Sequence, residues 1–129
     1  MYPDDLLYTK DHEWARKEGN SKVRTGITWY AQDALGDVVF VKLPDKGSSV
    51  SAGDAFAEVE STKAVSDVYA PVSGLVTEVN EDLVDSPEKI NEDPYGAGWI
   101  AIIEMSDESE LADLMDAEAY RQLVESGEG

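Results

Sequence analysis

One lysine stands where its amine would be easy for another protein to reach. Lys63 lies in the stretch EVESTKAVSDVYAP, between two short apolar segments, with the acidic residues Glu60 and Asp67 on either side. Its nearest neighbours are small and would not shield the amine: Ser61, Thr62 and Ala64. A Schiff-base lysine needs burial to lower its pKa, whereas a lysine that tethers a cofactor needs access. The pattern favours a covalent attachment point, and composition alone leaves an ordinary solvated turn lysine as the alternative.

Other catalytic patterns are missing from the sequence. There is no cysteine, which excludes disulfides, thiolate zinc sites and a cysteine nucleophile. A Ser-His-Asp triad would have to use the one histidine, His12, and the sequence has no G-x-S-x-G motif. His12 is therefore expected to be an ordinary polar residue on the surface. No glycine-rich phosphate loop precedes Lys63, and no calcium-loop spacing occurs. We therefore expect no metal site. A pair of carboxylates acting as acid and base stays open, because with 28 acidic residues the nearness of any two carries almost no information.

The charge of the chain limits its partners. It has 28 acidic against 10 basic residues and a net charge of −18, which would repel phosphate backbones and attract basic protein surfaces. The acidic residues are spread along the whole chain, as expected for solubility or for a salty cytoplasm. The longest strongly apolar run, 99–103, is too short to span a bilayer, and the first residues do not resemble a secretory or transit signal. The sequence thus predicts a cytoplasmic protein that binds neither nucleic acid nor membrane.

Short strands must position Lys63. Residues 55–60 and 64–71 read as two strands separated by only three residues, so Lys63 is expected at or near the tip of a tight hairpin. Further strands are predicted at 22–28, 37–44, 74–80 and 98–105. Segment 54–60 resembles segment 98–104, which suggests two β-halves packed face to face. About seven short strands indicate a small sandwich or barrel.

Few helices are expected. Thr28 is placed to cap a short helix, 29–35, that ends at Gly36. Residues 81–97, with two prolines, are predicted to be a long loop. A C-terminal helical segment is predicted over about 107–126, with Asp107 and Glu110 as a capping box. The length of 129 residues suits a single domain, residues 1–129, with its core at about 8–105.

Five motifs, in order, resemble the H protein of the glycine cleavage system, a lipoyl-carrying family, over residues 8–123. They are HEW (12–14), GIT with AQDALGDVVFVKLP (26–44), EVESTKAVSDVYAPVSG (58–74), VN (79–80) and INEDPYGAGW (90–99). The resemblance implies a mainly β barrel-sandwich hybrid with short flanking helices and a C-terminal helical segment. It places the lipoyl lysine on a hairpin turn, at Lys63.

The same resemblance implies a function and its partners. Lipoic acid would be attached to Lys63 by an amide, and the arm would carry the aminomethyl group of glycine from a pyridoxal-phosphate glycine decarboxylase to a tetrahydrofolate-dependent aminomethyltransferase. Dihydrolipoamide dehydrogenase would then reoxidise the arm with NAD. Tethering raises the effective concentration of the reactive group at each partner.

The resemblance also implies roles for residues around Lys63. The matching neighbourhood, expected to guide the lipoylating enzyme, consists of Glu60, Ser61, Thr62, Ala64 and Asp67. Glu13 matches a position that lines a cleft for the loaded arm, where a carboxylate could hold the cationic amine. Many relatives have a histidine where this chain has Tyr30, so arm docking is expected to be tuned differently here.

Rival interpretations are less consistent with the sequence. Biotin carriers usually place methionine on both sides of the lysine, and lipoyl domains of 2-oxo acid dehydrogenases usually read Asp-Lys-Ala on larger chains; here the flanks are Thr62 and Ala64. The sequence does not clearly distinguish a carrier for glycine cleavage from a lipoate-relay protein, which passes lipoyl groups to other enzymes. An unmodified acidic scaffold is the remaining alternative, and it requires Lys63 to carry nothing.

Overall fold

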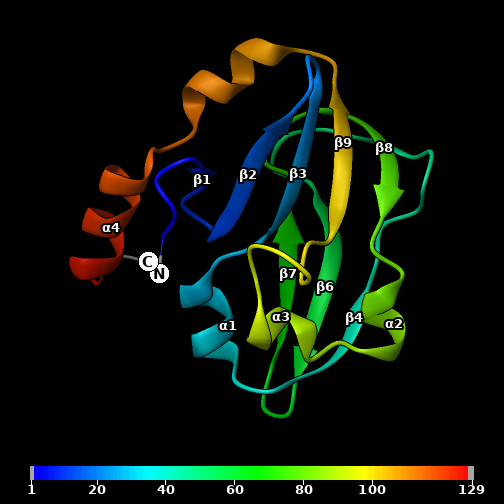
Figure 1. The fold of residues 1–129 in the computed structure, drawn as a ribbon, viewed down its shortest axis with the longest axis vertical. Coiled ribbons are helices and arrows are strands. Elements are labelled where there is room, and N and C mark those ends of the chain that lie inside the picture. Colours follow the sequence, from blue (N-terminus) through cyan, green and yellow to red (C-terminus); the bar gives the residue numbers. More distant parts are fainter. Residues whose placement is uncertain (1, 128–129) are drawn as a thin grey trace.

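Two antiparallel β-sheets form the body of the molecule, with short helices around their edges (Figure 1). The computed structural model describes residues 2–127. The larger sheet contains, in spatial order, β1 (Leu7–Tyr8), β2 (Glu13–Glu18), β3 (Lys22–Ile27), β9 (Ala101–Met105), β8 (Gly74–Val79) and β5 (Ser49–Val50). The smaller sheet contains β4 (Val38–Lys42), β6 (Ala55–Ser61) and β7 (Val65–Tyr69). The mainly β fold class is confirmed, with nine strands rather than about seven in residues 2–127.

The main core lies between the two sheets. Val41, Val59 and Val68 of the smaller sheet are almost fully buried. They belong to one apolar cluster with residues of the larger sheet: Ile27, Val76 and Ala101. Alternation along β6 explains the arrangement, because Ala57 and Val59 point inward while Glu58 and Glu60 point outward. The expected two β-halves therefore bury their apolar faces against each other.

The first helix, α1 (Trp29–Leu35), follows the predicted bounds. The Thr28 hydroxyl accepts a hydrogen bond from the Ala31 N–H at 3.2 Å and so caps its first turn. Gly36 ends the helix with a φ of 83°, in the left-handed region that favours glycine. This local chemistry fixes α1 between β3 and β4, directly before the strand that borders the Lys63 hairpin.

The prediction of a structureless loop over residues 81–97 is wrong in part. Two short helices, α2 (Asp82–Asp85) and α3 (Lys89–Glu92), occupy it. Their apolar residues Leu83 and Ile90 are fully buried in the main core. Four-residue helices are too short to show a helical period in sequence, so tertiary burial, and not local pattern, stabilises them.

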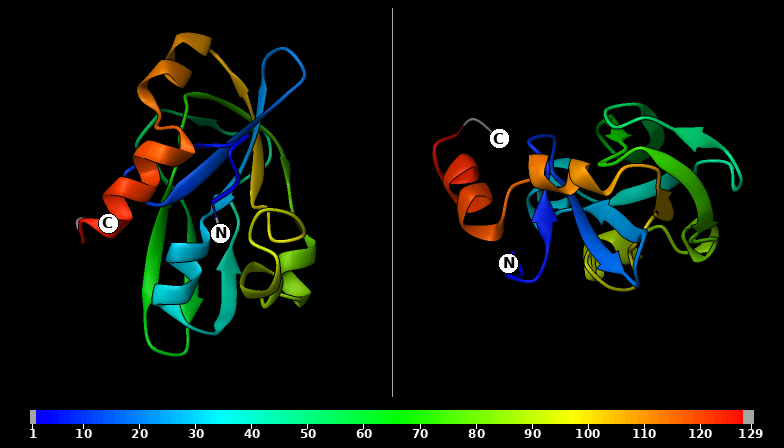
Figure 2. Two further views of the ribbon diagram at one scale, coloured as in Figure 1. Left: turned by 60° about the vertical axis from the view of Figure 1, so that its left-hand side comes forward. Right: turned by 90° about the horizontal axis from the view of Figure 1, so that it is seen from above.

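The C-terminal segment is helical but not continuous. A 3₁₀ helix, η1 (Glu108–Asp113), is followed by extended residues and then by α4 (Ala117–Glu125). Met115 breaks the helical run because its backbone N–H and C=O both pair with Tyr8 at 2.8 Å, as an isolated β-bridge. Figure 2 shows α4 lying beside the N-terminal segment.

The predicted capping box is only half formed. Asp107 caps η1 by accepting from the Ser109 N–H at 3.0 Å. The Glu110 carboxylate instead accepts from the N–H and hydroxyl of Ser73, at 2.7 and 2.8 Å. Glu110 therefore connects η1 to the turn before β8, and its side chain does not bond back to the first residue of the predicted capping box.

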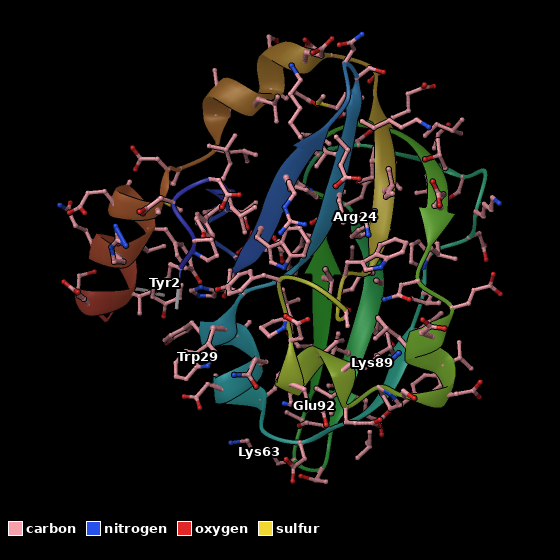
Figure 3. The ribbon with its side chains drawn as sticks, in the orientation of Figure 1. Tyr2, Arg24, Trp29, Lys63, Lys89 and Glu92 are labelled. Carbon is pink, nitrogen blue, oxygen red and sulfur yellow. The ribbon has the colours of Figure 1, made fainter. Side chains whose placement is uncertain are left out.

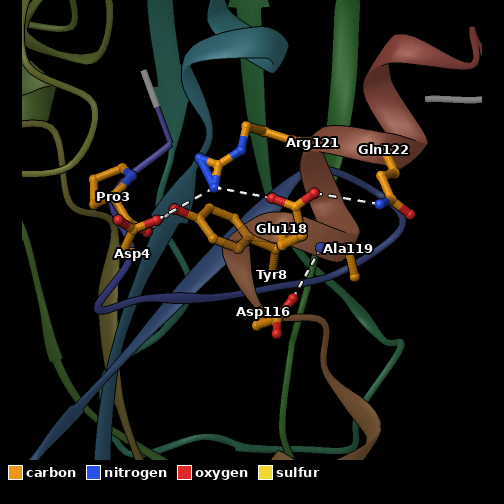
Figure 4. Close-up of polar contacts among 8 residues, drawn as sticks. All are labelled: Pro3, Asp4, Tyr8, Asp116, Glu118, Ala119, Arg121 and Gln122. Atoms are coloured by element: carbon orange, nitrogen blue, oxygen red, sulfur yellow. Dashed lines mark hydrogen bonds and ion pairs between the residues drawn. The ribbon is translucent and has the colours of Figure 1, made fainter.

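The N-terminal segment and α4 support each other. Tyr8 stacks on Tyr120 with ring centroids 4.7 Å apart, and both rings are fully buried. Around this contact, Arg121 forms ion pairs with Asp4 and Glu118 (Figure 4). These exposed pairs contribute little compared with the buried rings. None of the helices within residues 2–127 has the length and apolar character needed to cross a membrane.

Candidate functional site

Lys63 lies at the tip of the β6–β7 hairpin, as the sequence predicts. The two strands pair antiparallel up to Glu60 and Val65, and the Ser61 N–H donates to the Ala64 carbonyl at 2.8 Å. The side chains of Thr62, Lys63 and Ala64 are exposed. Figure 3 shows Lys63 at the lower end of the molecule, beside the tip of this hairpin. The amine is therefore accessible to another protein.

Ser61 holds the turn that presents the lysine. Its side chain is buried, and its hydroxyl accepts hydrogen bonds from the N–H groups of Lys63 at 3.2 Å and Ala64 at 3.1 Å. The Thr62 N–H donates to the Asp37 carbonyl at 3.1 Å, which connects the turn to the start of β4. Serine is suited to this position because its short hydroxyl satisfies nearby backbone donors in a turn. Lys63 thus extends from a fixed backbone.

A cleft of about 270 Å³ runs between the hairpin and α1. Its apolar lining comes from both sheets and from α1: Ile27, Ala31, Ala34, Leu35, Val59 and Val68. Its polar lining is Asp11, His12, Glu13, Tyr30, Ser66 and Asp67. A Cβ placed on Gly36, at the end of α1, would be 3.6 Å from Lys63 Cε, so the lysine stem lies beside the helix that forms one wall.

Glu13 is the buried carboxylate of this cleft, with only 2% of its surface exposed. Its Oε1 accepts from the Thr9 hydroxyl at 2.6 Å, and its Oε2 accepts from the Tyr69 N–H at 3.2 Å. Burial raises the pKa of Glu13 from 4.5 to about 7, although the two hydrogen bonds lower it and Asp11 raises it slightly. The carboxyl can therefore change its charge near neutral pH.

The expectation that His12 is plain polar surface is wrong. His12 lines the cleft, is half-buried, and has its ring centroid 4.6 Å from that of Tyr30. Its Nδ1 is 2.7 Å from the hydroxyl of Tyr120, which also bonds the Thr28 hydroxyl at 2.8 Å. A φ of 73° places His12 in the left-handed region at the tight turn before β2. No local pattern in the sequence indicates this placement.

The structure divides the predicted residues into two groups. Glu13, Tyr30 and Asp67 line the cleft, whereas Glu60, Thr62, Lys63 and Ala64 are exposed along the hairpin. Ser61 is buried inside the turn, and Glu13 is buried in the cleft. The sequence pattern misses the cleft residues of α1, Ala31, Ala34 and Leu35, because their position beside β7 depends on how the sheets pack. The roles given to these residues remain predictions.

Comparisons with known proteins agree with this geometry. Residues 6–127 match the family model of the glycine cleavage H-protein. A glycine cleavage system H protein of Mycobacterium avium is 59% identical over 123 residues, covering 92% of this chain and 93% of the relative. One of Mycobacterium tuberculosis is 58% identical over 125 residues, with the same coverage. The crystal structure of a glycine cleavage system H protein from Mycobacterium marinum superimposes with a TM-score of 0.85 at 46% identity, covering 97% of this chain and 98% of that one.

The fold therefore corresponds to the lipoyl-carrier barrel-sandwich architecture, and the match extends over both sheets, the hairpin and the C-terminal helices. The chain belongs to the glycine cleavage H-protein family, the lipoyl carriers of the glycine cleavage system.

Proposed function

We propose that this chain carries lipoic acid as an amide on Lys63 and moves the aminomethyl group of glycine between the enzymes of glycine cleavage. The observation that supports this most is the position of Lys63: exposed, at the tip of a hairpin whose backbone Ser61 fixes. A rigid hairpin with an accessible amine is what a modifying enzyme needs, and it lets a long arm swing without loosening the fold.

The residues beside the hairpin fit such an arm. The cleft next to Lys63 is lined by aliphatic side chains that would bury a hydrocarbon chain, with Glu13 among them as the buried acid. When bound, the lipoyl group supplies a dithiolane that accepts the aminomethyl group and two electrons. Glu13 would hold the cationic amine by charge-assisted hydrogen bonds, and the apolar walls would exclude water from it.

Tyr30 gives this cleft a neutral group where many relatives have a titratable one. The tyrosine ring lies against His12 and lines the cleft, so it covers one wall without adding a positive charge. We propose that Glu13, and not Tyr30, makes arm docking depend on pH in this chain.

The chemistry itself belongs to the cofactor and to the partners, and we propose no catalytic activity for this chain. Its partners would be a pyridoxal-phosphate glycine decarboxylase, a tetrahydrofolate-dependent aminomethyltransferase, dihydrolipoamide dehydrogenase and a lipoylating enzyme. We further propose that residues 1–129 act as one lipoyl-carrier domain in the cytoplasm. Tethering would supply each partner with a high local concentration of the reactive group.

The test is the substitution Lys63→Arg, which keeps the positive charge and blocks ordinary lipoylation. We expect the variant to fold normally and to support no glycine cleavage in a reconstituted system. Lys46→Arg changes an exposed turn lysine in the same way and should leave activity unchanged. Glycine cleavage retained by Lys63→Arg would contradict the proposed function.

A further inference from the structure

Two large apolar side chains are exposed beside the lysine tip. Phe40 of β4 is 53% exposed and Val65 of β7 is 60% exposed. Both are directly paired with Glu60 of β6, Phe40 on one side and Val65 on the other. Directly opposite residues project from the same face of a sheet with Cβ atoms about 5 Å apart. The three side chains therefore form one row, Phe40–Glu60–Val65, across the outer face of the smaller sheet, which we call the tip row.

The tip row lies next to the turn that carries Lys63. Glu60 precedes the lysine by three residues and Val65 follows it by two. The neighbouring row on the same face, Lys42–Glu58–Asp67, adds two acids and one base, and borders a hollow of about 110 Å³. Single exposed apolar residues are ordinary on a protein surface, but here two of them flank one carboxylate at a predicted site of modification.

This composition determines what could cover the row. A partner would need an apolar hollow for Phe40 and Val65 and a basic side chain between them for Glu60. A second copy of this chain does not fit, because a twofold contact on the row would bring Glu60 against Glu60 between two molecules of net charge −18. The occupant is therefore a different protein with a basic surface.

We propose that the tip row is the docking surface for the enzyme that acylates Lys63, and this rests on the proposed function. That enzyme must bring its active site to Nζ, so it must contact the hairpin on both sides of the turn. Enzymes that act on the finished arm react at its far end and have no such need to reach the turn. Phe40 extends the recognised surface to a strand outside the hairpin.

The transfer step limits how the row can act. Lys63 Nζ loses a proton and attacks the carbonyl carbon of an activated lipoyl donor, an acyl adenylate or a thioester. The C–N amide bond forms as the bond from that carbon to phosphate oxygen or to sulfur breaks, and AMP or the thiol leaves. The tip row takes no part in these bond changes; it holds the hairpin in register with the donor, so its loss should affect KM more than kcat.

The test measures initial rates of lipoylation by intact-mass spectrometry, with a purified lipoate ligase, lipoate and ATP. The double variant Phe40→Thr with Val65→Thr keeps β-forming residues and removes the apolar side chains. We expect kcat/KM to fall roughly tenfold, as for interface residues that dominate binding, with most of the change in KM. Val84→Thr, at a residue 62% exposed on α2, is the matched control and should react as the wild type does.

Three results would count against the proposal. Equal rates for the double variant and the wild type would overturn it. A double variant that is lipoylated normally but, once fully lipoylated, no longer supports glycine cleavage would show that the row binds a partner of the finished arm instead. A wild-type chain that accepts no lipoyl group would refute the proposed function, and with it this docking surface, whatever the variants do.

Discussion

Glu13 is the residue whose environment differs most from that expected of an acidic surface protein. Most of the chain's carboxylates are solvated, whereas Glu13 is buried between Thr9 and Tyr69 and faces the cleft. A buried carboxylate costs free energy unless it is paired or protonated. This cost is consistent with a site that awaits a cationic group, because an ammonium ion in the cleft would favour the ionised form.

Removal of this carboxylate should change how stability depends on pH. The pKa of Glu13 is raised from 4.5 to about 7 by burial, so the folded chain binds a proton that the unfolded chain has lost between these values. Glu13 therefore lowers the free energy of unfolding progressively as pH rises from about 4.5 to about 7. In Glu13→Gln this loss, on the order of 3 kcal/mol, should be absent.

The measurement is urea unfolding of both proteins at a series of pH values. As pH rises from about 4.5 to about 7, the unfolding free energy of Glu13→Gln should increase relative to that of the wild type. Above about pH 7 the difference between the two proteins should stay constant. Any constant offset reflects the altered bonds to Thr9 and Tyr69, since an amide has only one acceptor oxygen. Parallel pH profiles would show that Glu13 does not titrate there.

The C-terminal helix is connected to the cleft through one hydroxyl. Tyr120 of α4 bonds both His12 and Thr28, and Thr28 also caps α1, which forms a cleft wall. Tyr120→Phe should therefore destabilise the fold by about 1–3 kcal/mol, because one buried and one partly buried hydrogen bond are lost while the stacking on Tyr8 is kept. Thermal or urea unfolding measures this directly.

Tyr2→Phe is the matched control for this substitution. The Tyr2 ring packs edge-on against Tyr120, with centroids 5.2 Å apart, and its hydroxyl makes no hydrogen bond within residues 2–127. Its loss should leave the unfolding free energy nearly unchanged. Equal effects of the two substitutions would mean that the hydrogen bonds of the Tyr120 hydroxyl contribute nothing measurable to stability.

The strands around Lys63 could be predicted because their sequence carries the period of a half-buried sheet. Along β6 the buried residues Ala57, Val59 and Ser61 alternate with more exposed ones, and the gap of three residues between β6 and β7 leaves room only for a tight turn. The residues that begin and end α1, Thr28 and Gly36, also act on neighbours in sequence. Such features depend on neighbours in sequence and are visible before folding.

Other elements depend on contacts between distant residues. The strand β2 contains EWARKE, in which only Trp14 and Ala15 are apolar, and it forms because all six residues pair with β3. The helices α2 and α3 exist because Leu83 and Ile90 reach the core. The cleft brings together residues from the turn before β2, from α1 and from β7, so its shape could not be derived from any one segment.

The net charge of −18 acts on the whole chain. Most of the ion pairs within residues 2–127 have at least one largely exposed partner, as in Lys17 with Glu108 and Lys89 with Asp82, and such pairs offset little of the repulsion. Added salt screens like charges over a distance that falls from about 30 Å at 0.01 M to about 3 Å at 1 M. The melting temperature should therefore rise as ionic strength increases over this range.

Sodium and potassium chloride should act alike in that experiment, because screening depends on ionic strength and not on the cation. A melting temperature that falls with either salt would mean that the ion pairs matter more than the general repulsion. The same screening should weaken association with basic partner surfaces, so stability and binding are expected to respond to salt in opposite directions.

The most informative measurement is peptide mass spectrometry of the protein purified from cells that lipoylate other proteins. Trypsin does not cleave after an acylated lysine, so a lipoylated Lys63 should yield an uncut peptide covering 47–89, heavier by one lipoyl group. That result would establish the attachment site on which the carrier function depends. Peptides ending at an unmodified Lys63 would contradict it and favour a scaffold that binds partners through its acidic surface.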